Sequence, residues 1–354
     1  MRLTRREGLA VLAGMLGSTP AQARSLTEPD WVAERAKRGV PGLAAGWQRG
    51  ADAPQLRVAG VARADAPDAP LLTNARWHLG SLSKSMTATL AARAVEAGWI
   101  AWDSRIADTL GPLAEGMNPA YADVTLLHLL SHQAGLVPDI PQAAFSGFSR
   151  SELTDARGER LRYALIALGM EPLAAPATRM IYANNGYVVA AAMLETRMGA
   201  PWEALIRQWV FDPLGMETAG FGLPGHRHDP VGHIVAANGN RVPLSIDNPV
   251  PLGPAGRIHM ALPDLLRFLA AHRDRDPRFL ARGGWERLHT PPFGGDYALG
   301  WIVLPDGRLW HNGSNGFWYA EALIGARTVA AVVQNDVSAM SGLPSALIDQ
   351  LARR

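Results

Sequence analysis

The order in which hydrophobic periods follow one another along the chain is the feature that most limits its fold. Short apolar segments typical of β-strands occur near both ends, at residues 42–48, 55–62, 297–304, 308–311, 318–324 and 329–334. The stretch between them has helical spacing instead. This order predicts an α+β fold of two lobes. In it, the N- and C-terminal segments form one antiparallel sheet flanked by helices, and a mostly helical lobe is inserted beside the sheet.

Turn and helix signals complete this prediction. Residues 49–54 and the pair Asp306-Gly307 each separate two apolar segments in the way that a hairpin turn does. Helices are predicted at 27–38, 125–131, 160–168, 187–198, 202–210, 262–271 and 343–351. A ligand site is expected in the cleft between the two lobes.

Size and composition agree with two lobes. The chain has 354 residues, of which 48% are hydrophobic and 19% charged, which is enough for substantial cores. We expect a sheet lobe at about 24–75 and 290–354 and a helical lobe at about 85–285. The chain contains no cysteine, so disulfides and a thiolate nucleophile are excluded.

The first residues have the pattern of an export signal. Three arginines precede the apolar run 8–17, and Ala21-Gln22-Ala23 supplies the small residues of a cleavage site. The apolar run is too short to span a bilayer, and residues 4–9 are similar to a twin-arginine signal. We therefore predict that residues 1–23 are a signal peptide, that residues 24–354 form the folded domain, and that the protein is exported to the periplasm.

The charge of the remaining chain argues against some partners. Loss of residues 1–23 lowers the formal charge from +2 to zero. No cluster of basic residues with interleaved aromatic residues remains, so nucleic acid is not an expected partner. No membrane span is expected in the mature protein, and a small molecule or peptide is the expected substrate.

The stretch Gly80-Ser81-Leu82-Ser83-Lys84 begins a segment of helical periodicity that continues to Gly98. Ser81 and Lys84 are predicted to lie on its first turn, where residues three apart share a face and can touch. Lys84 is one of only two lysines, because the chain uses arginine almost everywhere for positive charge. A desolvated lysine can give up its proton and arginine cannot, so a titratable amine beside a serine indicates nucleophilic chemistry.

Two further motifs follow at suitable places. Tyr182-Ala183-Asn184 offers a phenol and an amide on an irregular segment before a predicted helix. His311-Asn312-Gly313 lies at the end of a predicted strand, where a glycine lets the backbone approach a ligand closely.

With these three motifs in order, the sequence resembles the penicillin-recognising serine hydrolases, specifically the class C β-lactamase branch. That branch also holds penicillin-binding proteins, D-alanyl-D-alanine carboxypeptidases, D-aminopeptidases and β-lactamase-like carboxylesterases. Framework stretches of the family are matched at 125–136, 213–216, 254–256 with Asp264 and Phe268, and 297–301. The resemblance covers roughly Val40 to the C-terminus and implies a serine hydrolase on the β-lactamase/transpeptidase fold.

The resemblance implies a role for each motif residue. Ser81 would be the acylated nucleophile, Lys84 a proton-relay amine and Tyr182 the general base. Asn184 would hold an oxygen of the substrate. The backbone N–H groups of Ser81 and of Ser314, the residue after Gly313, would form the oxyanion hole, which typically lowers the barrier by about 3–4 kcal/mol. No metal ion or organic cofactor is implied.

His311 departs from the pattern of many β-lactamases, which carry a lysine at this place. A neutral imidazole attracts a substrate carboxylate less than a permanent ammonium does. Histidine at this place is found in the peptidase and D-aminopeptidase members. The expected reaction is therefore hydrolysis of an ester, amide or β-lactam bond, with a carboxylesterase or D-peptidase activity favoured over efficient β-lactamase activity.

Other interpretations of these residues stay open. Ser-x-x-Lys alone is usually only the polar start of a helix, and Tyr182, Asn184 and His311 taken singly have structural explanations. His128 and His132 have the spacing of a zinc helix but lack its glutamate, so packing and capping roles are favoured.

Two alternative functions follow from these interpretations. His226, His228 and His233 could bind a metal ion, although a solvated loop is favoured. A metal-dependent hydrolase and a catalytically weak, penicillin-binding-type ligand-recognition protein on the same fold are the alternatives.

Overall fold

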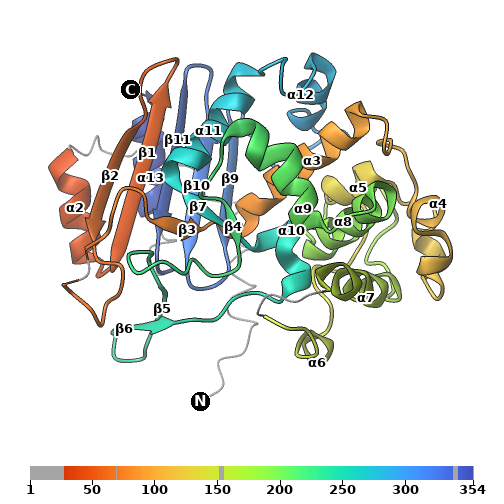
Figure 1. The fold of residues 1–354 in the computed structure, drawn as a ribbon, viewed down its shortest axis with the longest axis horizontal. Helices are drawn as coiled ribbons and strands as arrows, with labels where there is room; N and C mark the ends of the chain where they lie inside the picture. Colours follow the sequence, from red (N-terminus) through yellow and green to blue (C-terminus); the bar gives the residue numbers. More distant parts are fainter. Residues whose placement is uncertain (1–27, 69, 151–154, 338–341, 354) are drawn as a thin grey trace.

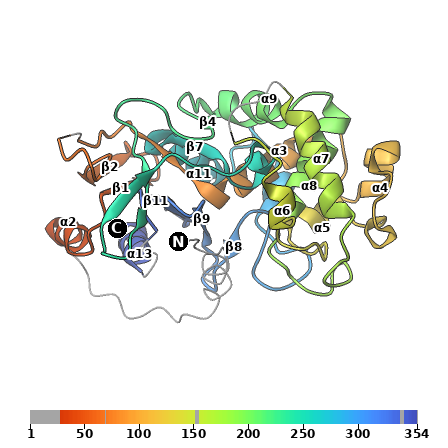
Figure 2. The ribbon, with the colours of Figure 1, turned by 90° about the horizontal axis from the view of Figure 1, so that it is seen from below.

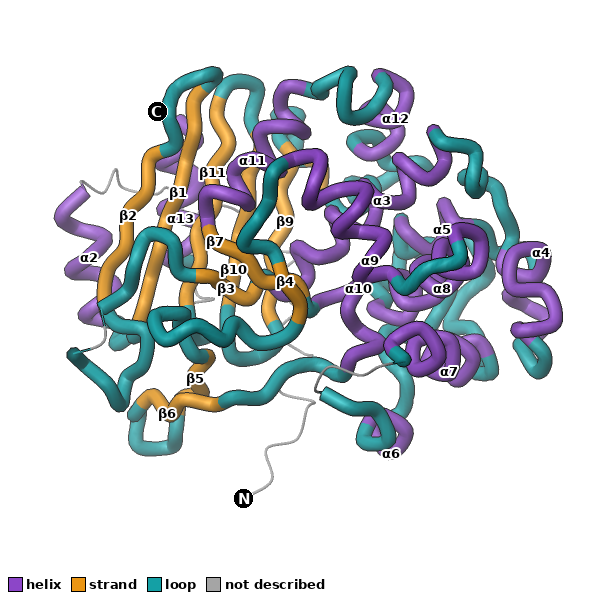
Figure 3. Tube along the Cα trace, in the orientation of Figure 1, coloured by secondary structure: helices purple, strands orange, loops and turns teal. Residues whose placement is uncertain are grey.

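The sheet in which the two ends of the chain meet is the centre of the fold. The computed structural model describes residues 28–68, 70–150, 155–337 and 342–353, so the predicted export signal lies outside the described residues. Six strands form an antiparallel sheet in the order β2-β1-β11-β10-β9-β8. Strands gather in one half of the molecule and most helices in the other (Figure 3). The α+β fold predicted from the sequence is confirmed.

The strands of this sheet come from the two ends of the described chain. They are β1 Gly42–Arg49, β2 Gln55–Gly60, β8 Ile302–Val303, β9 Leu309–Ser314, β10 Tyr319–Ile324 and β11 Thr328–Gln334. β1 lies between β2 and β11, with Leu43 opposite Gln334, so the first and last strands pair directly. The turn at Asp306-Gly307 is confirmed, because Gly307 has a φ of +82° and Leu304 N–H donates to Arg308 O.

The strand predicted at 297–304 is shorter in the structure, which has strand only at Ile302–Val303. The reason is a contact that the sequence pattern does not contain. Gly300 has a φ of +78°, and a Cβ at this position would lie 2.5 Å from the Cα of Ser85. The chain therefore turns against the helix that follows Ser81 before it enters the sheet.

Both faces of the sheet are covered by helices. Side chains of β11 alternate between the faces, so that Ala330 and Val332 pack toward α13 (Leu343–Arg353) while Ala331 and Val333 join the larger core. α11 (Leu262–Asp274) lies on that second face, opposite α13 (Figures 1 and 2). Although α11 falls within the range predicted for the helical lobe, it packs on the sheet; the lobe boundaries remain a prediction.

The other elements are short or belong to the helical part. The helices are α2 Glu28–Lys37, α3 Ser83–Glu96, α4 Ile106–Leu110, α5 Leu126–Leu130, α6 Gln142–Phe145, α7 Ala156–Leu168, α8 Asn184–Met198, α9 Trp202–Ile206, α10 Gly253–Gly256 and α12 Arg282–Leu288. A π-helical turn, Arg207–Phe211, continues α9, and 3-10 turns lie at η2 Gly80–Leu82, η3 Gly111–Ala114, η4 Pro119–Tyr121, η6 Asp212–Leu214 and η7 Val250–Leu252. Two small sheets comprise β3 Arg76–His78, β7 Ile258–Ala261 and β4 Gly220–Phe221, and the pair β5 Gly232–Val235 and β6 Arg241–Leu244.

One apolar core connects the two halves. It includes Ala331 of the sheet, Leu266 of α11, Leu90 of α3 and Val189 of α8, all fully buried. Within the described ranges no helix is both long and apolar enough to cross a membrane.

Candidate active site

Ser81 and Lys84 lie at the start of α3, between the sheet and the helical part. Ser81 is in the 3-10 turn η2, one turn earlier than predicted, and Lys84 is the second residue of α3. The Nζ of Lys84 lies 3.0 Å from the Oγ of Ser81, so the predicted contact between amine and hydroxyl is confirmed. Ser81 is partly exposed while Lys84 is fully buried, which leaves the hydroxyl reachable and the amine away from water.

Two further oxygens surround the amine of Lys84. Nζ donates to Asn184 Oδ1 and to the backbone oxygen of Ala255, each at 2.7 Å. Burial lowers the pKa of Lys84 to about 7, and the nearby carboxylate of Asp139 opposes this shift. At neutral pH the amine is therefore poised between its charged and neutral forms.

Tyr182 and Asn184 approach this pair from the start of α8. Asn184 is the first residue of the helix rather than part of an irregular segment, because tertiary contacts fix the helix start earlier than the apolar pattern indicates. One of these contacts is the bond from Asn185 N–H to Pro138 O. The Nδ2 of Asn184 donates to Asp139 Oδ1 at 3.0 Å, which turns its Oδ1 toward Lys84.

The phenol of Tyr182 forms a hydrogen bond with Ser81, and its ring centre lies 4.8 Å from Lys84 Nζ. Burial raises the pKa of Tyr182 well above its ordinary value near 10, although the hydrogen bond with Ser81 opposes the shift. The phenol is therefore protonated at neutral pH.

His132 supports Tyr182 from behind. The two ring centres are 4.2 Å apart, and His132 Nδ1 accepts a hydrogen bond from Ala183 N–H at 3.0 Å. His128 instead completes a capping box with Thr125 at the start of α5. The packing and capping roles predicted for these two histidines are confirmed.

His311 lies on β9 and is buried. Its Nδ1 contacts the backbone oxygen of Asn312, and its Nε2 is 3.2 Å from the hydroxyl of Tyr297. Burial, and secondarily the charge of Lys84, lowers the pKa of His311 to about 3. The imidazole is therefore neutral at physiological pH, and both ring nitrogens are occupied by protein groups.

The end of β9 packs directly against η2. A Cβ on Gly313 would lie 2.1 Å from Leu79 O and 2.5 Å from Ser81 N, and a Cβ on Gly80 would lie 2.2 Å from Ser314 N. Two glycines therefore allow the backbone N–H groups of Ser81 and Ser314 to come together. Such a pair of N–H groups can stabilise negative charge on an oxygen.

The structure does not bring His226, His228 and His233 together as a metal site. His233 lies in β5, where its ring nitrogens contact Asn335 O at 2.8 Å and Ala64 N–H at 3.0 Å. The interpretation of His233 as a solvated loop residue is wrong, because it is buried. In the part of the chain that the structure describes, no group of three or more His, Asp or Glu side chains is arranged to hold a metal ion.

The sequence did not single out Asp139 at the active site. It was missed because a lone aspartate in an irregular segment carries no periodic signal, and its partners Lys84 and Asn184 are distant in the sequence. Trp77, Trp301 and Trp318, which lie close to the three motifs in the sequence, are core residues, each 1% exposed.

A buried amine beside a serine hydroxyl, on a fold of sheet and helices, is typical of hydrolases that use a serine nucleophile. The family model "Beta-lactamase" matches residues 29–348, and the chain belongs to the Beta-lactamase family. It is a hydrolase of the β-lactamase fold.

The chain is similar to a penicillin-binding protein and to an esterase. "Penicillin-binding protein 4" of Amycolatopsis lactamdurans is 26% identical over 294 residues, which cover 74% of this chain and 73% of that protein. "Esterase EstB" of Burkholderia gladioli is 31% identical over 173 residues, covering 47% of this chain and 43% of that protein.

Solved structures share the fold at lower identity. The octameric penicillin-binding protein homologue from Pyrococcus abyssi has a TM-score of 0.76 at 23% identity, covering 92% of this chain and 77% of that one. D-amino acid amidase from Ochrobactrum anthropi SV3, solved with L-phenylalanine amide, has a TM-score of 0.74 at 20% identity, covering 91% and 95%.

Proposed function

We propose that the protein is a serine hydrolase that forms an acyl-enzyme on Ser81 and cleaves an ester, amide or β-lactam bond. One observation carries the proposal. Of the three oxygens around Lys84 Nζ, two are carbonyl oxygens of Asn184 and Ala255, which can only accept hydrogen bonds. Only Ser81 can donate to the amine.

This geometry fixes the direction in which the lone pair of the neutral amine points. A neutral Lys84 has two N–H bonds, which the two carbonyl oxygens take up, and its lone pair then faces the hydroxyl of Ser81. The orientation of Asn184 supports this assignment, because its amide N–H group donates to Asp139. Lys84 is thereby arranged as the base that takes the proton of Ser81.

Acylation then proceeds in two steps. Ser81 Oγ attacks the substrate carbonyl carbon while its proton moves to Lys84 Nζ, and the resulting oxyanion accepts hydrogen bonds from Ser81 N–H and Ser314 N–H. The bond to the leaving group breaks as that group receives a proton. In deacylation a water molecule attacks the acyl carbon and returns a proton to Ser81 along the same route.

Tyr182 completes the proton route. The resemblance implied a general base, but a protonated phenol supports a relay role: it gives its proton to the leaving group and takes one back from the ammonium of Lys84, which lies 4.8 Å from its ring centre. In this proposal Asn184 holds Lys84, and it can contact the substrate because it is partly exposed.

The state of His311 is the reason for favouring one class of substrate over another. A neutral imidazole with both nitrogens occupied offers no cation to a substrate carboxylate. We therefore favour esters and D-amino-acid peptides or amides over efficient β-lactam hydrolysis, as in the esterase and amidase relatives. Export to the periplasm through residues 1–23 is part of the same proposal.

Covalent labelling tests the proposed function. A fluorophosphonate should add its mass to Ser81, and Ser81→Ala should abolish turnover in a panel of p-nitrophenyl esters, nitrocefin and D-alanyl peptides. Turnover retained in Ser81→Ala, or absence of any adduct in folded wild-type protein, would contradict the proposal. A stable adduct without turnover of any substrate would favour the ligand-recognition alternative.

A further inference from the structure

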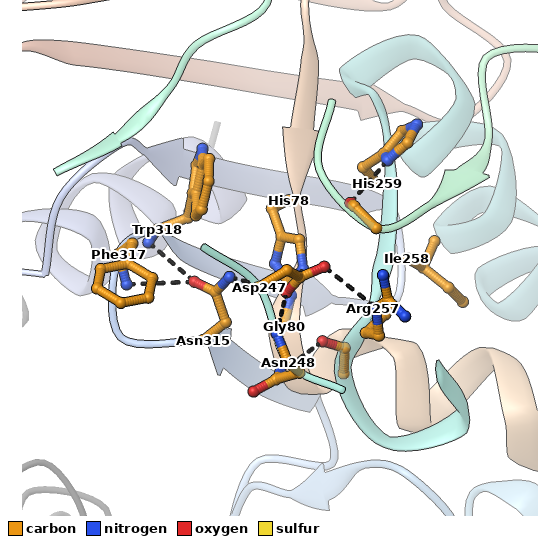
Figure 4. Close-up of polar contacts among 12 residues, drawn as sticks. His78, Gly80, Asp247, Asn248, Arg257, Ile258, His259, Asn315, Phe317 and Trp318 are labelled. Atoms are coloured by element: carbon orange, nitrogen blue, oxygen red, sulfur yellow. Dashed lines mark hydrogen bonds and ion pairs between the residues drawn. The ribbon is translucent and has the colours of Figure 1, made fainter. Parts of the chain in front are cut away.

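A buried polar cluster lies beside the two segments that carry the oxyanion N–H groups. Asp247, in the segment between β6 and η7, is its centre, with a side chain that is 0% exposed. Its Oδ1 lies 3.0 Å from Nε2 of His78 and accepts a hydrogen bond from Nδ2 of Asn315 at 3.1 Å. Its Oδ2 is 3.2 Å from Nε of Arg257. Figure 4 shows Asp247 between these three side chains.

The cluster reaches both segments that carry the oxyanion N–H groups. His78, the last residue of β3, accepts a hydrogen bond at Nδ1 from Gly80 N–H, the residue before Ser81, at 3.2 Å. Asn315 is the residue after Ser314. Asp247 is therefore linked to the residue before Ser81 through the side chain of His78, and to the residue after Ser314 because that residue is Asn315.

Asn315 is itself tightly held. Its Oδ1 accepts hydrogen bonds from the backbone N–H groups of Phe317 and Trp318, at 3.2 Å and 3.3 Å, which fixes the turn after β9. The ring of Trp318 stacks on His78 at 5.4 Å. The turn after β9 and the segment before η2 are thus packed against one another, and each also contacts Asp247.

The same carboxylate is linked to the backbone around Lys84. Arg257 comes two residues after Ala255, whose oxygen accepts from Lys84, and Asn248 Nδ2 donates to Gly256 O at 3.0 Å. Asn248 N–H also donates to Asp247 at 2.7 Å. The segments that hold the base and both oxyanion donors therefore meet at one buried carboxylate.

The arrangement excludes proton transfer to the substrate by His78. Its Nδ1 faces Gly80 N–H and its Nε2 faces Asp247, so neither nitrogen is directed at Ser81. Burial raises the pKa of Asp247, but His78 and, to a lesser extent, Arg257 outweigh this effect and hold the pKa well below its usual range. Asp247 is thus a permanent negative charge that fixes donors around it, and it has no part in the chemistry.

We propose that Asp247, with His78 and Asn315, is a positioning cluster that sets the separation and direction of the Ser81 and Ser314 N–H groups. The inference rests on the proposed acyl-enzyme chemistry, because an oxyanion must form for its position to matter. Preorganised donors are effective because they need no reorganisation during the reaction. Loss of the carboxylate should therefore weaken oxyanion stabilisation while leaving the Lys84–Ser81 pair in place.

A comparison of an ester with its thionoester tests directly how the Ser81 and Ser314 N–H groups are placed. Replacing the carbonyl oxygen by sulfur weakens hydrogen bonding to the oxyanion hole and leaves the leaving group unchanged. Asp247→Asn should lower kcat/KM for a p-nitrophenyl ester by about 10–100-fold, less than loss of a whole donor. The thionoester should lose less than about threefold, so the ratio of kcat/KM for the ester to kcat/KM for the thionoester should fall by about threefold or more.

Two controls make the result specific. Rates are expressed per Ser81 that a fluorophosphonate can label, so that misfolded protein is not counted. Asp264→Asn removes a comparably buried carboxylate, since the whole residue is 2% exposed at Asp264 and 3% at Asp247. Asp264 contacts Thr218 and Arg267 instead, and its ratio should match wild type. The pH dependence of the ester reaction should also keep its midpoint in Asp247→Asn, since Lys84 is untouched.

An unchanged ratio in folded Asp247→Asn would overturn the inference, whether kcat/KM falls equally for both substrates or for neither. If Asp247→Asn does not fold, Asn315→Ala and His78→Gln are used in its place, with the same expected and contradicting results. Absence of any acylation in wild-type protein would instead overturn the proposed function, and it would be seen before any ratio is measured.

Discussion

At the scale of single residues, Lys84 has properties that its position in the sequence only partly explains. The motif predicted that its amine touches Ser81, since residues three apart share a helix face. The lowered pKa comes from complete burial, and the carboxylate of Asp139 opposes the shift. The local sequence pattern could not supply this property, because the burial arises only when the fold packs distant segments, among them those of Asn184 and Ala255, around the amine.

Lys84→Arg keeps the positive charge and removes the titratable amine. Turnover should fall by about 10³-fold, because arginine cannot accept the proton of Ser81. Steady-state kinetics with an activated ester measures this loss. Lys37→Arg, which changes the other lysine of the chain at an exposed place in α2, is the matched control and should behave like wild type. Wild-type-like activity in Lys84→Arg would contradict the role of Lys84 as base.

The pH dependence follows from the same residue. Because the active form of Lys84 is the neutral amine and its pKa is lowered to about 7, kcat/KM should rise with pH up to a midpoint near 7 and then level off. A pH profile of kcat/KM measures this midpoint for the free enzyme. A midpoint near 10, the ordinary lysine value, would mean that the amine is not desolvated in solution.

At the scale of elements, the junction between η2 and β9 depends on two glycines. Gly313→Ala would place a Cβ 2.1 Å from Leu79 O and 2.5 Å from Ser81 N, so the strand must move away from the 3-10 turn. Activity should fall by about 100-fold or more and the free energy of unfolding by about 1–3 kcal/mol. Ester hydrolysis and urea unfolding measure the two effects.

Gly283→Ala provides the control for this substitution. A Cβ at this position in α12 has no heavy atom within 4 Å, and its backbone is ordinary for an L-residue. The variant should keep full activity. Equal losses in Gly283→Ala and Gly313→Ala would show that the contact between β9 and η2 is not what matters.

The strands were easier to predict than the polar contacts between elements. Apolar segments of strand type mark β1, β2, β10 and β11 because each is a local pattern. β8 is shorter than predicted because Gly300 turns against Ser85, a contact from another part of the chain. Asp139 and Asp247 were missed for the same reason: each is a single polar residue whose partners are far away in sequence.

At the scale of the whole molecule, one core is shared by the sheet and the helical part. Leu266 of α11 and Leu90 of α3 belong to the same buried cluster as Val333 of β11. Unfolding of either half would expose apolar surface of the other, at a cost of about 25 cal/mol per Å². The two halves should therefore unfold together.

Urea denaturation tests this coupling. Tryptophan fluorescence, far-UV circular dichroism and residual esterase activity should give coincident transitions with one midpoint. Trp77, Trp285 and Trp318 report on different buried regions of the molecule. Two separated midpoints would mean that the lobes are independent folding units.

The pairing of β1 with β11 also has a consequence for synthesis. β1 is made among the first elements of the described chain and β11 among the last, yet they are neighbours in the sheet. While the chain is still on the ribosome, the edge of β1 that β11 will cover has unsatisfied backbone groups and is open to pairing with another chain. Closure of the sheet therefore waits until β11 has been made, and the interval before it is when aggregation competes with folding.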